Sequence, residues 1–303
     1  MSDFKFLQNS VSGKWVVSAP RRAERPDVAK GTNILCPFCP GREKEEKEVY
    51  RIDKDKKELI CKDNLGCIVD DSSWLVRVLP NKFPFAPIHE VIVHSPEHHK
   101  NFGELPVSAV ELVFKAYRQR YQTHSKYGQV YIFNNSGKGS GESLLHPHSQ
   151  LVVIPNNVSL EIEPPEKDLK SLESIKTDHF YIFCPDTSEW PDETWIASKG
   201  LKFGNITDGE ISDLASSISR LIQILTLRHN GEFPFNFYIY PGDNWYLRIM
   251  PRLKSLGGFE LGTRVFVNTQ DPKETMAFLK EHFENPDEEK IKSTQQALYK
   301  KAV

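Results

Sequence analysis

The 303-residue sequence lacks a surplus of charge of either sign, since 39 lysines and arginines stand against 41 aspartates and glutamates. The formal net charge of -2 offers no broad electrostatic surface for nucleic acid or an anionic membrane, so any phosphate site must be local. No segment approaches the roughly 20 apolar residues of a membrane span, and the N-terminus has no basic segment followed by an apolar one. We therefore expect a cytoplasmic protein that has neither nucleic acid nor a membrane as its partner.

Cysteine is scarce, and its five copies are an odd number. Two of them form a Cys-x-x-Cys motif at Cys36 and Cys39, which in a reducing compartment indicates metal or redox chemistry before structural disulfides. Cys61, Cys67 and Cys184 are then expected to be free thiols.

The sequence contains an internal repeat. Each copy has an apolar run, a Phe-Gly pair, an amphipathic helical pattern, an aromatic and β-branched run, and a last strand-like run that ends before proline. The first copy uses residues 91–93, 102–103, 110–121, 130–133 and 150–154, and the second uses residues 194–197, 203–204, 211–225, 237–240 and 246–250. Helices between groups of strands predict an α+β fold with an antiparallel sheet, built as a tandem duplication with domains at 1–160 and 161–303.

Two further segments are predicted from composition. Residues 156–175 are rich in proline and glutamate, which is typical of a connection and not of a core element. Asp271 and Pro272 form an N-cap signal before an apolar helical pattern, so we expect a C-terminal helix there.

A glycine-rich loop at residues 134–143 leads toward two histidines, His146 and His148. Such a loop can direct backbone N–H groups at phosphate oxygens, with Lys138 adding positive charge, although a plain turn is the commoner interpretation of a loop alone. The two histidines stand at alternate positions at the start of a strand-like run, so their side chains share a face.

His148 is the candidate nucleophile, because neutral imidazole attacks phosphorus and is well populated at physiological pH. The carbonyl of Pro147 could accept from a ring N–H and set the tautomer. Gln150 lies on the same face, where its amide can bond a phosphoryl oxygen but cannot donate a proton as a histidine does. The simpler alternative is a pair of surface histidines at a strand entrance, and the loop and Gln150 argue against it.

The Cys-x-x-Cys motif suits chelation of zinc, but it supplies only half of a tetrahedral site. The remaining ligands could come from Cys61, Cys67, His89, His94, His98, His99 and His146. A thioredoxin-like redox site is disfavoured, since no strand precedes Cys36 and no helical pattern starts there. Two unrelated thiols remain the alternative without function.

Two basic and aromatic segments could bind a nucleotide. Three arginines, Arg21, Arg22 and Arg25, follow a strand-like run and could clamp phosphate, although a solvated basic turn explains them equally well. Residues 81–85 place phenylalanines beside Asn81, as a base pocket would, although phenylalanine at a strand end is usually part of the core.

The order of these motifs resembles that of the galactose-1-phosphate uridylyltransferase family, a branch of the histidine-triad superfamily. The resemblance rests on the arginine-rich turn, the Cys-x-x-Cys motif and segments 81–84, 95–98, 133–137 and 146–150, and it spans nearly the whole chain. It implies two histidine-triad-like domains, a cytoplasmic homodimer in galactose metabolism, and ping-pong exchange through a nucleotidyl-histidine.

The resemblance also implies roles for individual residues. His148 would be the nucleophile and Gln150 its phosphoryl partner, while Ser143, Asn135 and the loop at Gly137 would contact phosphates. Zinc would be held by Cys36, Cys39, His98 and His146. Arg22 and Arg25 would lie near the phosphates, and the nucleoside would be surrounded by Phe38, Asn81 and Phe83. The second repeat has Asn244, Trp245 and Tyr246 where many relatives hold a second metal, so none is expected there.

Segment 257–264 departs from the pattern for hexose binding and is closer to a divergent group that includes ADP-glucose phosphorylase. We expect uridylyl exchange between UDP-hexose and hexose 1-phosphate, with adenylyl transfer from ADP-glucose to phosphate as the alternative. A third hypothesis is a zinc-stabilised sugar-nucleotide binding protein without turnover. A histidine-triad hydrolase is disfavoured because Gln150 replaces the third histidine.

Overall fold

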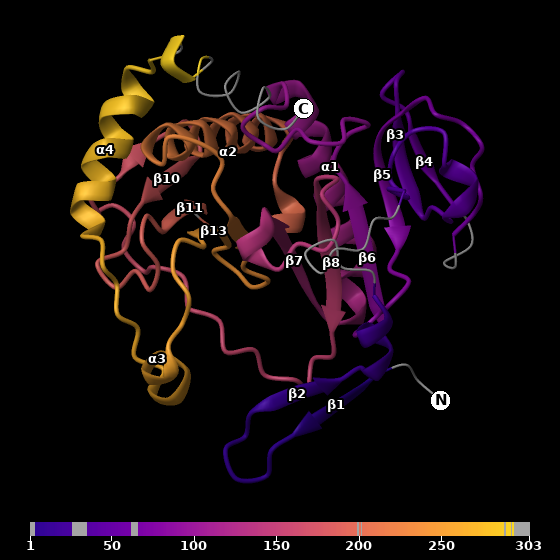
Figure 1. The fold of residues 1–303 in the computed structure, drawn as a ribbon, viewed down its shortest axis with the longest axis horizontal. Coiled ribbons are helices and arrows are strands. Elements are labelled where there is room, and N and C mark those ends of the chain that lie inside the picture. The colour runs from indigo at the N-terminus through magenta and orange to yellow at the C-terminus, as the bar shows by residue number, and fades with distance from the viewer. Residues whose placement is uncertain are drawn as a thin grey trace.

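The computed structural model describes residues 4–25, 35–61, 66–198, 200, 202–287, 289–291 and 293. Its centre is an 11-stranded antiparallel sheet in the order β4-β3-β5-β6-β8-β7-β12-β13-β11-β10-β9. The strands are β3 (Tyr50–Asp53), β4 (Glu58–Ile60), β5 (Trp74–Pro80), β6 (Ile88–Val93), β7 (Gln129–Ser136), β8 (His148–Ile154), β9 (Ile175–Lys176), β10 (Phe180–Phe183), β11 (Thr194–Ser198), β12 (Phe235–Ile239) and β13 (Tyr246–Pro251). A separate hairpin, β1 (Lys5–Gln8) and β2 (Trp15–Ser18), projects away from this sheet (Figure 1).

Helices cover one face of the sheet (Figure 1). They are α1 (Val107–His124), α2 (Asp208–Arg228) and α4 (Pro272–Glu284), whereas the short α3 (Gly258–Thr263) lies on a separate loop. Strand β8 shows how the two faces differ, because side chains alternate along a strand. Leu151 and Val153 join the core beneath the helices, and Val152 joins a smaller cluster on the opposite face. The even positions of β8, including His148 and Gln150, therefore lie on the face that the helices leave open.

The two halves join through the central pair β7 and β12, in which Asn135 lies opposite Asn236. On either side the strand order is mirrored, since β7-β8-β6-β5 corresponds to β12-β13-β11-β10. The predicted α+β class with an antiparallel sheet and a duplicated unit is thus confirmed. One sheet runs through both copies, and the division at residue 160 stays a prediction.

The repeated Phe-Gly pairs have a packing role. A Cβ on Gly103 would lie 2.9 Å from the side chain of Ile222 in α2, and one on Gly204 would lie 2.5 Å from the ring of Tyr121 in α1. Each glycine therefore allows the helix of the other half to approach closely. The predicted C-terminal helix is also present as α4, where the Asp271 side chain caps the Lys273 amide.

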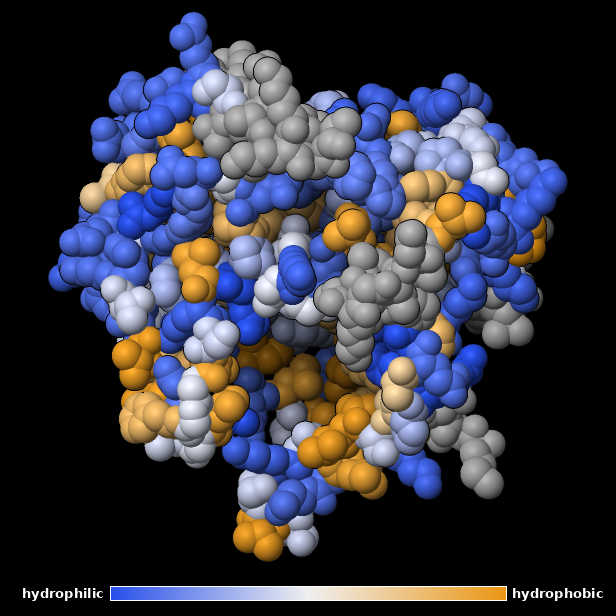
Figure 2. Space-filling view, viewed as in Figure 1, coloured by the Kyte–Doolittle hydropathy of each residue, from blue (hydrophilic) through white to orange (hydrophobic). Residues whose placement is uncertain are grey.

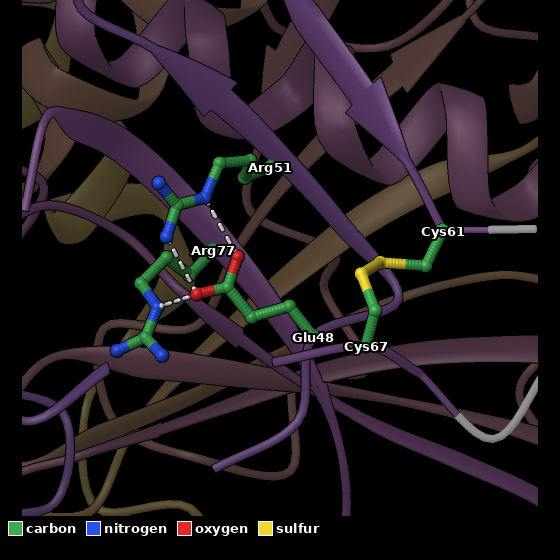
Figure 3. Close-up of a disulfide and its surroundings, with 5 residues drawn as sticks. All are labelled: Glu48, Arg51, Cys61, Cys67 and Arg77. Carbon is green, nitrogen blue, oxygen red and sulfur yellow. Dashed lines mark hydrogen bonds and ion pairs between the residues drawn. A yellow bond between two sulfur atoms is a disulfide. The ribbon is translucent and has the colours of Figure 1, made fainter. Parts of the chain in front are cut away.

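The prediction of free thiols at Cys61 and Cys67 is wrong, because the two form a disulfide (Figure 3). The Glu48 amide donates to the Cys67 carbonyl at 2.8 Å, and the Cys61 amide donates to the neighbouring Val49 carbonyl at 3.2 Å. The Cα atoms of Cys61 and Cys67 lie 5.8 Å apart, a normal span for a disulfide. Beside it, the buried carboxylate of Glu48 accepts from Arg51 and Arg77 (Figure 3). Cys184 remains a free thiol.

The helices of the described residues are too short or too polar to cross a lipid bilayer.

Candidate active site

A cavity of about 270 Å³ opens beside His148. Its walls come from five segments that are distant in the sequence, and they combine aromatic and aliphatic side chains with polar groups. Seven of the predicted site residues line it, namely Arg25, Phe38, Asn81, Phe83, Ser143, His148 and Gln150. Leu79 and Val91 extend its apolar wall, and Glu45, Glu46 and Lys82 add charge that the sequence analysis did not assign.

His148 begins β8 and pairs with Val93 of β6. Its Nδ1 lies 2.8 Å from the carbonyl oxygen of His146. A carbonyl can only accept, so Nδ1 carries the proton and Nε2 keeps its lone pair. Burial lowers the pKa of His148, and the cation of Arg25 lowers this pKa further, so the neutral ring is favoured.

The suggestion that Pro147 fixes this tautomer is wrong. The Pro147 carbonyl instead accepts from the His94 amide at 3.2 Å. Successive carbonyls of an extended chain point to opposite sides, so only one of the two neighbouring carbonyls can reach the ring of His148.

The backbone around His148 is held by a polar network beneath the sheet. Asn134 Nδ2 donates to the His148 carbonyl at 2.8 Å and lies 3.2 Å from the hydroxyl of Ser149. The same hydroxyl contacts His94 Nε2 at 2.8 Å and the hydroxyl of Tyr117. All of these residues are buried. This network was not predicted from the sequence. Asn134 and Ser149 could have indicated it, because they are polar residues at positions where strand alternation directs the side chain into the core.

Gln150 is bonded from behind by two residues. Its Oε1 lies 2.9 Å from His89 Nε2 and 3.5 Å from Asn81 Nδ2. The Asn81 Oδ1 in turn accepts from the Phe83 amide at 2.8 Å. His89, considered in the sequence only as a metal ligand, therefore supports Gln150 from behind the cavity wall and does not belong to the metal cluster described below.

The predicted arginines occupy different positions. Arg22, in a 3-10 turn at Pro20–Glu24, donates to the Phe83 carbonyl at 2.7 Å and lies over the Phe85 ring at 4.7 Å. Burial, with a contribution from the charge of Arg25, lowers the pKa of Arg22 to about 10. Arg22 thus supports the cavity wall from outside, whereas Arg25 lines the cavity itself.

Two predicted phosphate contacts do not line this cavity. Asn135 faces a second cavity of about 560 Å³ across the central strands, where its Oδ1 accepts from Asn236 at 2.7 Å. Gly137 has a φ of +83°, and its N–H donates to the carboxylate of Glu142 at 3.1 Å. A hollow with hydrophobic residues in its walls is visible on this side of the molecule between α3 and the β1–β2 hairpin (Figure 2).

Cys36, Cys39, His98 and His146 form a cluster whose ligand atoms all lie within 4.8 Å of one another. His146 Nδ1 is 3.7 Å from both sulfurs, and His98 Nδ1 is 3.0 Å from Cys39 Sγ. Tetrahedral zinc with bonds of about 2.0–2.3 Å needs ligand atoms roughly 3.3–3.8 Å apart, so the group fits. The Nε2 of His146 lies 2.8 Å from the Ser95 carbonyl, which leaves Nδ1 free to bind a metal.

The corresponding place in the second half is filled by the protein itself. Tyr246 begins β13 as His148 begins β8, and its ring stacks on Trp195 with centroids 4.1 Å apart. Two residues further, Arg248 donates through Nη2 to Glu189 and Glu193, at 2.9 Å each. Side chains and ion pairs therefore occupy the space where the first half has a cavity.

Comparison with known proteins agrees with this geometry. The family model described as "Galactose-1-phosphate uridyl transferase, N-terminal domain" matches residues 88–154. ADP-glucose phosphorylase of Arabidopsis thaliana is 24% identical over 90% of this chain and 92% of its own length. Galactose-1-phosphate uridylyltransferase of Kluyveromyces lactis is 26% identical over 76% of this chain and 74% of its own.

Solved structures show the same fold. The crystal structure of the Arabidopsis thaliana ADP-glucose phosphorylase with bound ADP-glucose superposes with a TM-score of 0.68, at 24% identity, over 92% of this chain and 99% of that one. A structure of uridylyltransferase gives a TM-score of 0.69 at 19% identity, over 91% and 97%. In its motif order and its duplicated fold, the chain is thus similar to galactose-1-phosphate uridylyltransferases and to ADP-glucose phosphorylase, and the family model covers the part of the chain that contains His148 and Gln150.

Proposed function

We propose that this protein transfers a uridylyl group between UDP-hexose and hexose 1-phosphate through a covalent nucleotidyl-His148. The observation that carries the proposal is the tautomer of His148, whose Nδ1–H is bonded to the His146 carbonyl at 2.8 Å while the ring lines the cavity. A nucleophile of this kind needs a free Nε2 lone pair and a fixed ring.

In the first half-reaction, His148 Nε2 attacks the α-phosphorus of the sugar nucleotide. The N–P bond forms, and the bond from phosphorus to the bridging oxygen breaks, so hexose 1-phosphate leaves with the electron pair. The ring then carries a positive charge, which the bond from Nδ1–H to the His146 carbonyl stabilises. In the second half-reaction, a phosphate oxygen of the acceptor attacks the same phosphorus, and the ring returns to its neutral state.

The cavity walls suit this exchange. Ser143, Gln150 and Arg25 offer a hydroxyl, an amide and a guanidinium for the phosphoryl oxygens, whose negative charge develops in the transition state. Phe38 and Leu79 provide an apolar surface for a base. Since the Gln150 amide cannot act as an acid or base near neutral pH, the site is suited to transfer and not to activation of water.

Adenylyl transfer from ADP-glucose to phosphate is the second candidate. It is favoured by the similarity to an ADP-glucose phosphorylase over 90% of this chain and by the altered segment 257–264. The nucleotidyl group would again be attached to His148, but the intermediate would carry adenine in place of uracil and the acceptor would be phosphate.

A panel of sugar nucleotides tests both candidates. The full-length protein is incubated with UDP-glucose or ADP-glucose and analysed by intact mass, with His148→Ala as the control. A uridylyl adduct lost in His148→Ala supports the first candidate, and an adduct from ADP-glucose alone selects the second. Absence of any adduct contradicts both and favours the binding protein without turnover, for which His148→Ala would leave ligand affinity unchanged.

The proposal includes a structural zinc ion on Cys36, Cys39, His98 and His146. The ion would tie the Cys-x-x-Cys turn, which carries Phe38, to the segment that ends in His148. Its role would be to cross-link these two walls of the cavity. We also propose that the protein is a homodimer of two-domain chains divided near residue 160.

A further inference from the structure

We infer that His89 is a positioning residue, which turns the amide of Gln150 so that its NH₂ group, and not its oxygen, faces the phosphoryl group. The inference rests on the proposed transfer through His148. It assigns a role to a residue that neither motif nor metal cluster includes.

His89 lies on β6 directly beside β8, with its backbone opposite Val152. The side chain is 5% exposed and packs edge-on against the Phe85 ring, with centroids 4.4 Å apart. Its Nε2 lies 2.9 Å from Gln150 Oε1. The ring therefore contacts Gln150 from behind, because Gln150 lines the cavity and His89 does not.

A backbone donor determines the tautomer of His89. The Phe85 N–H points at Nδ1 at 3.4 Å, and because a backbone N–H can only donate, Nδ1 must accept. Burial lowers the pKa of His89 to about 4, with the cations of Arg22 and Arg25 also lowering it, so the ring carries one proton at neutral pH. That proton is on Nε2, and Gln150 Oε1 is its acceptor.

Asn81 acts in the same direction. Its Oδ1 accepts from the Phe83 N–H at 2.8 Å, so its NH₂ group is turned toward Gln150 Oε1, 3.5 Å away. This NH₂ group also lies 3.1 Å from His89 Nε2, and in the opposite tautomer it would donate there. The lone pair of His89 Nε2 would then also repel Gln150 Oε1, 2.9 Å away, so Gln150 would turn its amide over and present its oxygen to the phosphate. The two tautomers thus impose opposite orientations on Gln150, and the Phe85 amide selects the one that suits an anion.

The consequence is a preorganised donor. The Oε1 of Gln150 accepts from the Asn81 NH₂ group and from His89 Nε2–H. The NH₂ group of Gln150 is therefore left to donate to a phosphoryl oxygen. Removal of one preorganised donor to a developing oxyanion typically slows a reaction about 100- to 1000-fold, and loss of its orientation should have a smaller effect, at least about tenfold.

Kinetics of nucleotide loading test the inference. The rate of adduct formation on His148 is measured in a single turnover for the wild type, His89→Leu, His89→Gln, Gln150→Met and the double variant His89→Leu/Gln150→Met. We expect His89→Leu to slow loading at least about tenfold with a smaller change in nucleotide affinity, and His89→Gln, which keeps a donor, to restore most of the rate. In the Gln150→Met background, His89→Leu should have no further effect. Equal slowing by His89→Leu in both backgrounds would show that His89 does not act through Gln150.

The imidazole ¹⁵N shifts of His89 provide a readout that does not depend on turnover. We expect one proton on Nε2 and none on Nδ1 between about pH 6 and 8, given the low pKa. A proton on Nδ1 would overturn the inference. A wild-type protein that forms no adduct would instead refute the proposed function, and the tautomer would still be measurable in that case.

Discussion

The glycine-rich loop contains a carboxylate whose ionisation should change the stability of the protein near neutral pH. Glu142 precedes Ser143, is partly buried, and accepts from the Gly137 amide at 3.1 Å. Burial raises the pKa of Glu142 to about 7, with a smaller contribution from the charge of Glu232, although the bond from Gly137 lowers it. The folded protein therefore prefers the neutral acid over a pH range in which the unfolded chain is already ionised.

The size of the effect follows from the two ionisation constants. A pKa of 4.5 in the unfolded chain and about 7 in the folded protein means that the folded state retains the proton between these values, so stability falls as pH rises from about 4.5 to above 7. A tenfold change in an ionisation constant is worth about 1.4 kcal/mol, so the loss approaches roughly 3 kcal/mol at pH 8. Glu142→Gln keeps the acceptor for Gly137 and removes the charge, so it should be more stable than wild type by about 1–3 kcal/mol at pH 8 and equally stable below pH 4.5.

Denaturant unfolding at several pH values measures this difference directly. Both proteins are prepared with the same metal content, and Glu166→Gln, at an exposed position outside the loop, serves as the matched control. The control should follow the wild type at every pH. A Glu142→Gln variant that gains no stability on the alkaline side, or gains as much at pH 4 as at pH 8, would refute the reasoning.

Two further predictions concern the metal cluster and the second half of the sheet. Cys39→Ser should lower both the zinc content and the melting temperature, because it removes one of four ligands, and metal analysis showing full occupancy would contradict this. Arg248→Met should cost about 3–5 kcal/mol in chemical denaturation, because Glu193 would stay buried without its partner, while loading of His148 continues in the folded fraction. Adding Glu193→Gln should recover part of that loss, and a double variant no more stable than Arg248→Met would count against the ion pair as the cause.

Local patterns in the sequence were sufficient for the framework of this protein. The 3.6-residue periodicity of α1 and α2, the alternation along β8 and the N-cap at Asp271 each depend on residues within one or two turns or along one strand. The same is true of His148 and Gln150, because neighbours two apart on a strand share a face whatever the rest of the chain does. The family resemblance added the choice of His98 and His146 as partners for the cysteines, which spacing alone had left open among seven candidates.

Other features depended on which strands lie side by side. His89 meets Gln150 across 61 residues because β6 pairs with β8 in one particular register. Cys36 meets His146 across 110 residues, where the loop with the two cysteines packs beside the segment before β8. The Cys61–Cys67 disulfide depends likewise on the bridge between Cys67 and Glu48. The sequence by itself thus determined the elements and the place of the proposed nucleophile, His148, at the start of a strand. Only the tertiary structure decided the hydrogen bonds that orient His148 and Gln150, because such bonds require ångström-level placement of groups that no local periodicity relates.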